Sequence, residues 1–434
     1  MPIRLSDVFS TSKLSKFSYV SRTYKHGLTY DEYLANLLKD NDKIISISGP
    51  TKSGKTTLTK NVISESKLVR LHGADISSSD KLWELALAKL NYSTISKETK
   101  GLENSSETSL NADTGAIGWL KGIVIKVGHK RAKKKTKTIQ FDKRYSDHQN
   151  AIKAMVQQKR VLLIDDFHYI DFDVQKDICR QLKGDLESEH PPIIICSIPS
   201  RADATTRALN ELHGRVASIK FNKWGKNELE GIIHRGFQAL NYNVQSSTEA
   251  MDLFLTEALG SPHVVQDCCK FIGKINNINT ANKKFWAPGI LELTIENIKE
   301  SLNEVASELN YDRSYRLLEE GLNTKGRPRV VHTIIGDGDE LEDADVYQII
   351  LKALEQDPPI DTISRTDIDS RILKVVRNTT PSRSSVGAVL RNLNRLVLDT
   401  NPRNKILEWD EGANELIIMD PLFLLYLRHA NKGR

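Results

Sequence analysis

The sequence predicts an α/β protein in which a parallel sheet is covered by helices on both faces, followed by a helical subdomain and a last unit of three helices and a β-hairpin. Short apolar runs such as Val161 to Ile164 and Ile193 to Cys196 alternate with helical patterns. Strands that are apolar on both sides are typical of a covered parallel sheet. A helical pattern extends from Lys226 to Leu309 and separates the sheet from the last unit.

Length and composition favour a soluble protein of two or three domains. The chain has 434 residues, of which 39% are apolar and 27% charged, which excludes disordered and membrane-spanning classes. The first residues lack the apolar stretch of a signal peptide, so we expect a cytoplasmic location and no membrane partner. The four cysteines lack metal-binding spacing and lie in apolar segments, which predicts buried thiols: Cys179, Cys196, Cys268 and Cys269.

The elements of the sheet follow one another along the chain. A β-branched strand from Lys43 to Ser48 leads through a glycine-rich loop into a helix that begins at Lys55. A helix over 79–90, with Ser79 or Asp80 as its N-cap, follows a strand at 68–71. Further strands are expected at 161–164, 193–196 and 216–221, and further helices at 147–158, 174–186 and 202–212.

These patterns predict the domain boundaries. We expect an N-terminal segment (1–30), an α/β core (31–222) with a polar insertion (about 92–142), a helical lid subdomain (223–322), a linker (323–343) and a last domain (344–434). In the last domain, three helices precede two strands, which describes a winged helix: 346–356, 367–376 and 384–396, then 405–409 and 415–419.

The clearest chemical motif is a phosphate-binding loop between the first strand and its helix. The segment from Gly49 to Thr56 matches GxxxxGK[ST], in which backbone amides surround phosphates, Lys55 reaches the terminal phosphates and Thr56 ligates Mg²⁺. The alternative is a glycine-rich turn that matches by chance, which the flanking strand and helix disfavour. The expected nucleotide-binding residues are Gly49, Pro50, Thr51, Lys52, Ser53, Gly54, Lys55, Thr56 and Thr57.

Two aspartates supply a second motif. Asp165 and Asp166 end the apolar strand that begins at Val161, which resembles a Walker B element. Asp165 would hold Mg²⁺ through water, and Asp166 would orient or deprotonate the attacking water. The alternative is an acidic helix cap after a buried strand.

Together, the two motifs resemble the P-loop ATPases of the AAA+ and STAND superclass, especially archaeal origin-recognition ATPases and prokaryotic transposition or defence ATPases. This resemblance implies ATP and Mg²⁺ as cofactors and ATPase activity. It also implies three further site residues. Ser197 stands at the sensor 1 position, Arg215 before the fifth strand at the arginine-finger position, and Pro262 in the turn near the adenine.

Two departures from the family pattern bear on hydrolysis. The pair Asp165-Asp166 replaces the common Asp-Glu, and the shorter carboxylate implies slow turnover. His263 follows the turn where an arginine is common, and a neutral imidazole stabilises a γ-phosphate less than a guanidinium does.

Positive charge is concentrated in the insertion. Trp119 to Arg144 contains ten Lys or Arg and one Asp, a local charge of +9 that exceeds the +6 of the whole chain. Lys130 to Lys137 could therefore bind DNA or RNA phosphates, the alternative being a solvated loop. A second nucleic-acid surface is expected on the recognition helix of the winged helix, at Arg383, Arg391 and Arg395. The ending Asp420 to Arg428 resembles the DPxFxxYLR ending of prokaryotic ATPases, where this unit serves protein contacts as readily as DNA.

These features predict an ATP-driven, oligomerising switch of mobile-element or antiviral defence biology, acting with a separate effector protein or nucleic acid. One alternative is a DNA-binding AAA+ adaptor of transposition or replication. The other is a winged-helix transcription regulator that binds ATP without turnover. ATPase rates with and without duplex DNA discriminate among them, because only the adaptor predicts strong dependence on DNA.

Overall fold

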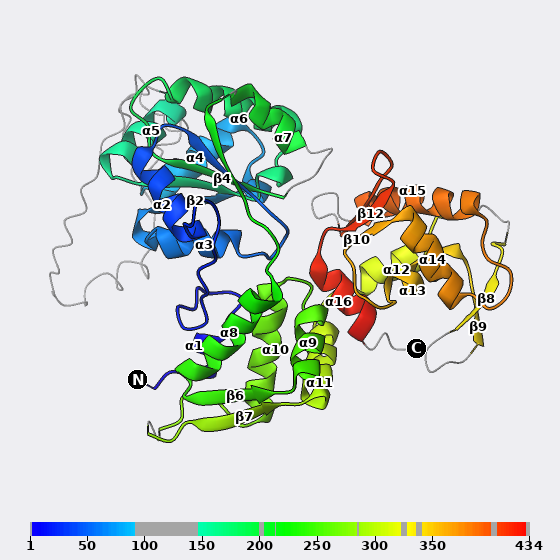
Figure 1. Cartoon of the computed structure of the whole chain (residues 1–434). Coiled ribbons are helices and arrows are strands. Elements are labelled where there is room, and N and C mark those ends of the chain that lie inside the picture. Colours follow the sequence, from blue (N-terminus) through cyan, green and yellow to red (C-terminus); the bar gives the residue numbers. More distant parts are fainter. Residues whose placement is uncertain are drawn as a thin grey trace, which may run out of the picture.

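The computed structural model describes residues 2–91, 146–198, 204–212, 214–283, 286–322, 328–335, 341–400 and 406–430 (Figure 1). The insertion predicted over about 92–142, with its basic segment Lys130 to Lys137, lies outside the described residues.

A five-stranded parallel sheet forms the α/β core. Its strand order is β2-β3-β4-β1-β5, so that the first strand lies between the fourth and the fifth. The strands are β1 (Ile44–Ser48), β2 (Leu68–His72), β3 (Val161–Asp165), β4 (Ile193–Ser197) and β5 (Val216–Lys220). All five strands predicted for the core are confirmed, each within about two residues of its expected bounds.

Helices cover both faces of this sheet, which confirms the predicted fold class. One face packs against α2 (Tyr30–Asp40) and α3 (Lys55–Val62). The other packs against α4 (Ser79–Lys89), α5 (Asp147–Gln157), α6 (Phe172–Asp185) and α7 (Ala204–Leu209). Alternate strand residues face opposite helices: Leu162 contributes to one apolar cluster and Leu163 to the other.

The N-cap of α4 lies one residue earlier than predicted. The side chain of Ser78 accepts a hydrogen bond from the backbone N–H of Lys81, the role expected of Ser79 or Asp80. Ser79 instead donates its hydroxyl to Asp177 of α6. Because Ser79 is engaged by α6, the hydroxyl of the preceding serine caps the helix instead.

A lid subdomain follows the core. It consists of α1 (Leu5–Val8), α8 (Lys226–Ala239), β6 (Tyr242–Ser246), α9 (Thr248–Glu257), α10 (Pro262–Ile275), β7 (Gly289–Leu293) and α11 (Ile295–Ser307). The expectation of a purely helical pattern over 226–309 is wrong here, because β6 and β7 form a two-stranded parallel sheet. Most of their side chains are exposed or half-buried, so their apolar periodicity is weak.

The C-terminal unit contains the three helices and the hairpin predicted for it, with additional elements. Its elements are α12 (Asp312–Glu320), β8 (His332–Ile335), β9 (Leu341–Ala344), α13 (Val346–Leu354), β10 (Thr362–Ser364), α14 (Arg365–Val375), α15 (Arg383–Thr400), β11 (Leu407–Asp410), β12 (Glu415–Ile418) and α16 (Pro421–His429). Three strands pair in the order β10-β12-β11. The segment predicted as a linker contains the antiparallel pair β8 and β9.

Helix α16 joins the lid to the C-terminal unit. Leu422 and Leu425 are buried in the apolar cluster of the lid, whereas Phe423 and Leu427 are buried in that of the C-terminal unit. In Figure 1 this helix, in red, lies between the lid and the remainder of the unit. Among the described residues, no helix has both the length and the apolar character needed to cross a membrane.

Candidate nucleotide site

The phosphate-binding motif lies where the sequence predicts it, in the loop between β1 and α3. Gly54 has a φ of 102°, a left-handed conformation that favours glycine over any other residue. A Cβ atom on Gly49 would come within 2.5 Å of the carbonyl oxygen of Phe221. Both glycines of the motif are therefore required by the fold itself.

The motif lysine points into its own loop. Lys55 is buried, and its ammonium donates hydrogen bonds to the carbonyl oxygens of Gly49 at 2.8 Å and Pro50 at 2.7 Å. Burial lowers the pKa of Lys55, and the nearby Cys196, Asp166 and Asp165 oppose that shift. The loop thus holds a desolvated positive charge, which favours an anionic ligand.

The structure brings together the two residues predicted to hold a metal ion. The hydroxyl of Thr56, in the first turn of α3, donates to Oδ2 of Asp165, at the end of β3, over 2.9 Å. The side chain of Asp165 is 2% exposed. A hydroxyl and a carboxylate oxygen at this distance are hard oxygen donors of the kind that Mg²⁺ prefers, so these residues fit the ion.

Asp166 lies next to this pair. His72, Asp165 and Asp166 each offer one atom that could bind a metal ion, and these three atoms lie within 4.8 Å of one another. Asp166 has a φ of 55°, and burial followed by the charge of Asp165 raises its pKa. A carboxylate with a raised pKa is a better proton acceptor, which suits the role predicted for Asp166.

Ser197 and Arg215 lie at opposite ends of the parallel strands. Ser197 is buried at the carboxyl end of β4, opposite Ser48 in the register, and its carbonyl oxygen accepts the N–H of Gly49. Arg215 precedes β5, at the end away from the loop. Its guanidinium donates to the carbonyl oxygen of Lys183 at 2.9 Å and to Glu187 at 3.0 Å. Arg215 therefore has no access to the loop of its own chain.

A cavity of about 290 Å³ opens beside the loop. Its walls come from the loop, β2, the N-terminal segment and the start of α10, including Thr56, Lys60, Arg70, Tyr19 and Pro262. Pro262 is buried at the first position of α10, and its place near the adenine stays a prediction. The neighbouring His263 has its pKa lowered to about 4, by burial first and by Lys52 second, so its imidazole is neutral at pH 7.

Several residues of the site were not predicted from the sequence. Arg22, from the N-terminal segment, donates to the backbone oxygens of Asn222 and Lys223 and lies 4.6 Å from the ring centre of Trp224. The indole N–H of Trp224 donates to the carbonyl oxygen of Ser53 in the loop. A tryptophan directly after the last strand of the core is a signal that could have indicated this contact.

A third residue that was not predicted from the sequence is the arginine in β2. Arg70 donates from Nε and Nη2 to Oδ2 of Asp165, at 3.1 and 2.7 Å. An arginine inside an otherwise apolar strand is the available signal, because such a charge needs a partner.

The loop also contacts the C-terminal unit directly. The ammonium of Lys52 lies 3.5 Å from Oδ2 of Asp420, the N-cap of α16. Asp420 is buried and accepts the hydroxyl of Tyr311 at 2.6 Å and the N–H of Leu422 at 3.1 Å. The segment after β5 adds an ion pair between Lys223 and Asp361.

The arginines expected on the recognition helix lie on α15. Arg383 is paired with Asp369 at 3.6 Å, Arg391 with Glu411 at 3.8 Å, and Arg395 is exposed. Pairing of this kind on the surface is weak, so it leaves these side chains accessible to phosphates.

No protein-family model matches the sequence, and no curated protein matches it. Among solved structures, the chain is similar to Cdc6p from Pyrobaculum aerophilum, at 12% identity and a TM-score of 0.41, over 98% of this chain and 97% of that one. A Walker-type ATPase of Pyrococcus abyssi has 13% identity and a TM-score of 0.46, over 95% and 99%. The ORC2 protein of Aeropyrum pernix has 11% identity and a TM-score of 0.43, over 94% of each chain.

Proposed function

We propose that this protein binds ATP with Mg²⁺ at the loop from Gly49 to Thr57, hydrolyses it slowly, and uses the nucleotide to move the lid and the C-terminal unit relative to the core. The motif residues, their burial and the adjoining cavity support nucleotide binding. The observation that carries the switch is the ion pair between Lys52 of the loop and Asp420 of α16.

In this proposal, different side chains of the site have separate roles in binding and hydrolysis. Lys55 leaves the carbonyl oxygens of the loop and neutralises the terminal phosphates. Thr56 and Asp165 hold Mg²⁺, which supplies positive charge to the β- and γ-phosphates when bound. Asp166 orients the attacking water and accepts its proton. Ser197, at the end of β4, is proposed to contact the water or the γ-phosphate.

The contact between Lys52 and Asp420 gives the nucleotide a route to the C-terminal unit. Lys52 belongs to the loop that surrounds the phosphates, so a polyphosphate competes with Asp420 for its ammonium. Asp420 also caps α16, so a change at its carboxylate acts on the helix that both the lid and the C-terminal unit share. Binding energy at the loop can thereby be used to shift the position of α16.

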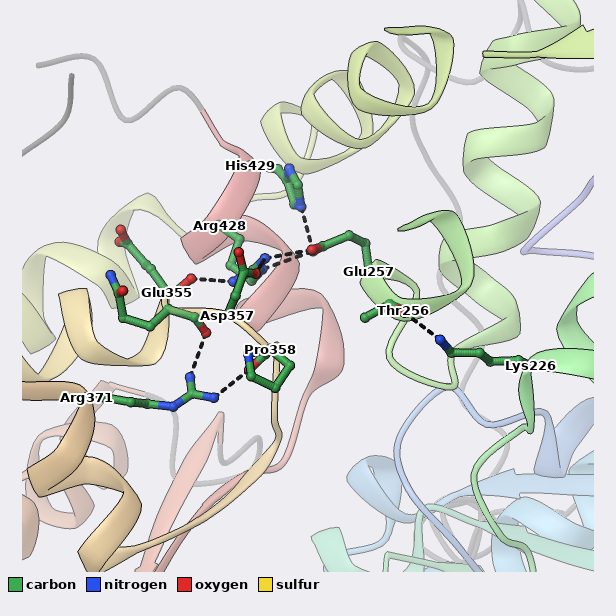
Figure 2. A network of polar contacts seen from close by, with 10 residues as sticks. Lys226, Thr256, Glu257, Glu355, Asp357, Pro358, Arg371, Arg428 and His429 are labelled. Atoms are coloured by element: carbon green, nitrogen blue, oxygen red, sulfur yellow. Dashed lines mark hydrogen bonds and ion pairs between the residues drawn. The ribbon is translucent and has the colours of Figure 1, made fainter. Parts of the chain in front are cut away.

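The lid and the C-terminal unit are themselves firmly connected. Figure 2 shows Glu257 of α9 accepting hydrogen bonds from Arg428 at 2.6 and 2.9 Å and from His429 at 2.8 Å. Arg428 also bonds Asp357 and the carbonyl oxygen of Glu355 in the C-terminal unit. We infer that the lid and the C-terminal unit move as one body relative to the core.

Such a movement would expose surfaces for assembly and for partners. Arg215, which faces away from its own loop, is proposed to act on the nucleotide of a neighbouring subunit. Homo-oligomerisation, a separate effector and a role in mobile-element or antiviral defence remain proposals that follow from the resemblance in the sequence.

Measuring the distance between the core and the C-terminal unit tests the switch. The four native cysteines are buried, as predicted, and burial raises their pKa values, so they react slowly with maleimides. Dyes attached at Lys89→Cys of α4 and Leu373→Cys of α14, both exposed, report the distance by single-molecule energy transfer.

We expect ATP with Mg²⁺ to shift the energy-transfer distribution, and Lys55→Ala to abolish the shift. Asp420→Asn, which keeps the capping oxygen but removes the charge, should populate the shifted state without nucleotide. A distribution that is identical with and without ATP, in protein shown to bind ATP, would reject the switch.

A further inference from the structure

The most informative unassigned group at the site is the guanidinium of Arg70. It reaches Asp165 from the neighbouring strand β2, whose residue His72 is opposite Asp165 in the register. Its Nε and Nη2 atoms both donate to Oδ2 of Asp165, and the hydroxyl of Thr56 donates to the same oxygen. Three donors therefore converge on one carboxylate oxygen.

We propose that Arg70 is a positioning residue that competes with Mg²⁺ for the carboxylate of Asp165 and thereby sets the Mg²⁺ concentration that nucleotide binding requires. This inference rests on the proposed function, because it assumes that Thr56 and Asp165 hold the ion. The oxygen that receives Arg70 and Thr56 has no lone pair left for a water ligand of a cation. Mg²⁺ and the guanidinium consequently exclude each other at Oδ2.

The burial of Asp165 explains why the competition matters. Its side chain is 2% exposed, and a buried carboxylate is costly without a counter-charge. Within the described part of the chain, Arg70 is the basic side chain in ion-pair contact with it, since Lys55 donates to loop carbonyls. Arg70 can thus stabilise the site and orient Asp165 and Thr56 before a metal ion arrives.

The guanidinium of Arg70 can also move away from Asp165. Its side chain is 28% exposed and lines the cavity beside the loop, so it can turn toward solvent or toward a phosphate without unfolding β2. Two effects follow from one residue. Arg70 supplies positive charge to a nucleotide when Mg²⁺ is scarce, and it raises the Mg²⁺ concentration at which the metal-bound form predominates.

Titrating a fluorescent ADP analogue against the full-length chain, in EDTA and at increasing Mg²⁺, tests this role. The variants are Arg70→Gln, Arg70→Lys, and Arg180→Gln as a matched control, because Arg180 of α6 is exposed and pairs with a half-buried carboxylate, Glu211, away from the site. Circular dichroism shows whether each variant is folded. If Arg70→Gln does not fold, Arg70→Lys is the variant compared with the wild type.

In Arg70→Gln we expect a fall of about tenfold in the Mg²⁺ concentration that gives half of the change in nucleotide affinity, because one charge-assisted hydrogen bond has about this strength. The nucleotide affinity in EDTA should weaken by a similar factor. Arg70→Lys should lie between Arg70→Gln and the wild type, and Arg180→Gln should match the wild type. An unchanged Mg²⁺ dependence in folded Arg70 variants would overturn this role alone. Failure of the wild type to bind the nucleotide at any Mg²⁺ concentration would reject the proposed function and this inference with it.

Discussion

The hydroxyl of Thr56 and the carboxylate of Asp165 are joined by a hydrogen bond of 2.9 Å, although 109 positions separate them in the chain. The parallel order of the sheet produces this contact, because the helix after β1 begins at the edge where β3 ends. The phosphate loop and the aspartate pair, found independently in the sequence, therefore each place one residue in this contact. This supports a single site for metal and phosphate.

Lys55→Ala should abolish ATP binding, whereas Asp166→Ala should preserve it and accumulate the ATP-bound form. Lys55 carries the buried positive charge of the loop, but Asp166 acts mainly on the attacking water. Equilibrium binding and single-turnover hydrolysis separate the two effects. Equal ATP affinity in Lys55→Ala and the wild type would rule out the loop as the nucleotide site.

Glu257→Gln should lower the free energy of unfolding by about 3–5 kcal/mol, because it removes the buried carboxylate that pairs with the buried guanidinium of Arg428. Asp357→Asn is the matched control: Asp357 bonds the same guanidinium at 2.6 Å but is 84% exposed, so we expect a loss of less than about 1 kcal/mol. Urea unfolding measures both, and equal losses would show that burial does not determine the strength of this junction.

The same junction should weaken in acid. Burial alone would raise the pKa of Glu257, but the hydrogen bonds from His429 and Arg428 outweigh it and lower the pKa from 4.5 to about 2. The stabilisation is therefore present above pH 4.5 and is lost as the pH falls toward about 2. Subtracting the acid unfolding curve of Glu257→Gln from that of the wild type isolates this contribution, and parallel curves would contradict the assignment.

Arg215 should be needed for hydrolysis across a subunit boundary. Its guanidinium is held by Lys183 and Glu187 at the end of the sheet away from its own loop. Turnover per subunit should rise with protein concentration, and Arg215→Ala should bind ATP but lose most turnover. Mixing Arg215→Ala with Lys55→Ala should restore part of the activity. An inactive mixture, with wild-type turnover independent of concentration, would leave Arg215 a surface residue.

The basic segment gives a prediction about nucleic acid. Replacing six of its cations by glutamine should weaken DNA binding, and each lost phosphate contact should reduce the slope of log K against log salt by about 0.9 for duplex DNA. Filter binding at several salt concentrations measures the slope, and an unchanged slope would indicate a solvated loop. The residues are Lys130, Arg131, Lys133, Lys134, Lys135 and Lys137.

Local signals in the sequence located the two motifs that meet at the candidate site. The phosphate loop and the pair Asp165-Asp166 depend on short segments with strict spacing, and the buried strands β3 and β4 are apolar up to the polar residue that ends each of them. The two strands of the lid were missed because Tyr242 to Ser246 is short, has no fully buried side chain and lies between strong helical patterns.

Local sequence patterns could not predict contacts between segments that are distant in the chain. The role of Arg70 depends on the register of β2 against β3, and the pair formed by Lys52 and Asp420 joins a loop near the start of the chain to a helix near its end. Neither residue of that pair shows its partner through periodicity or spacing. The cation at the fourth position of the motif and the aspartate before Pro421 acquire a joint role only in the folded chain.

The central claim, that the nucleotide and Asp420 compete for Lys52, is tested most directly by the ATP dissociation constants of four proteins: the wild type, Asp420→Asn, Lys52→Ala and the double variant. Because coupling between sites is reciprocal, Asp420→Asn should tighten ATP binding by about fivefold or more in the wild-type background. The same substitution should have no effect in the Lys52→Ala background, since the ion pair is already absent there. Equal effects of Asp420→Asn in both backgrounds, or weaker ATP binding in Asp420→Asn, would contradict the claim.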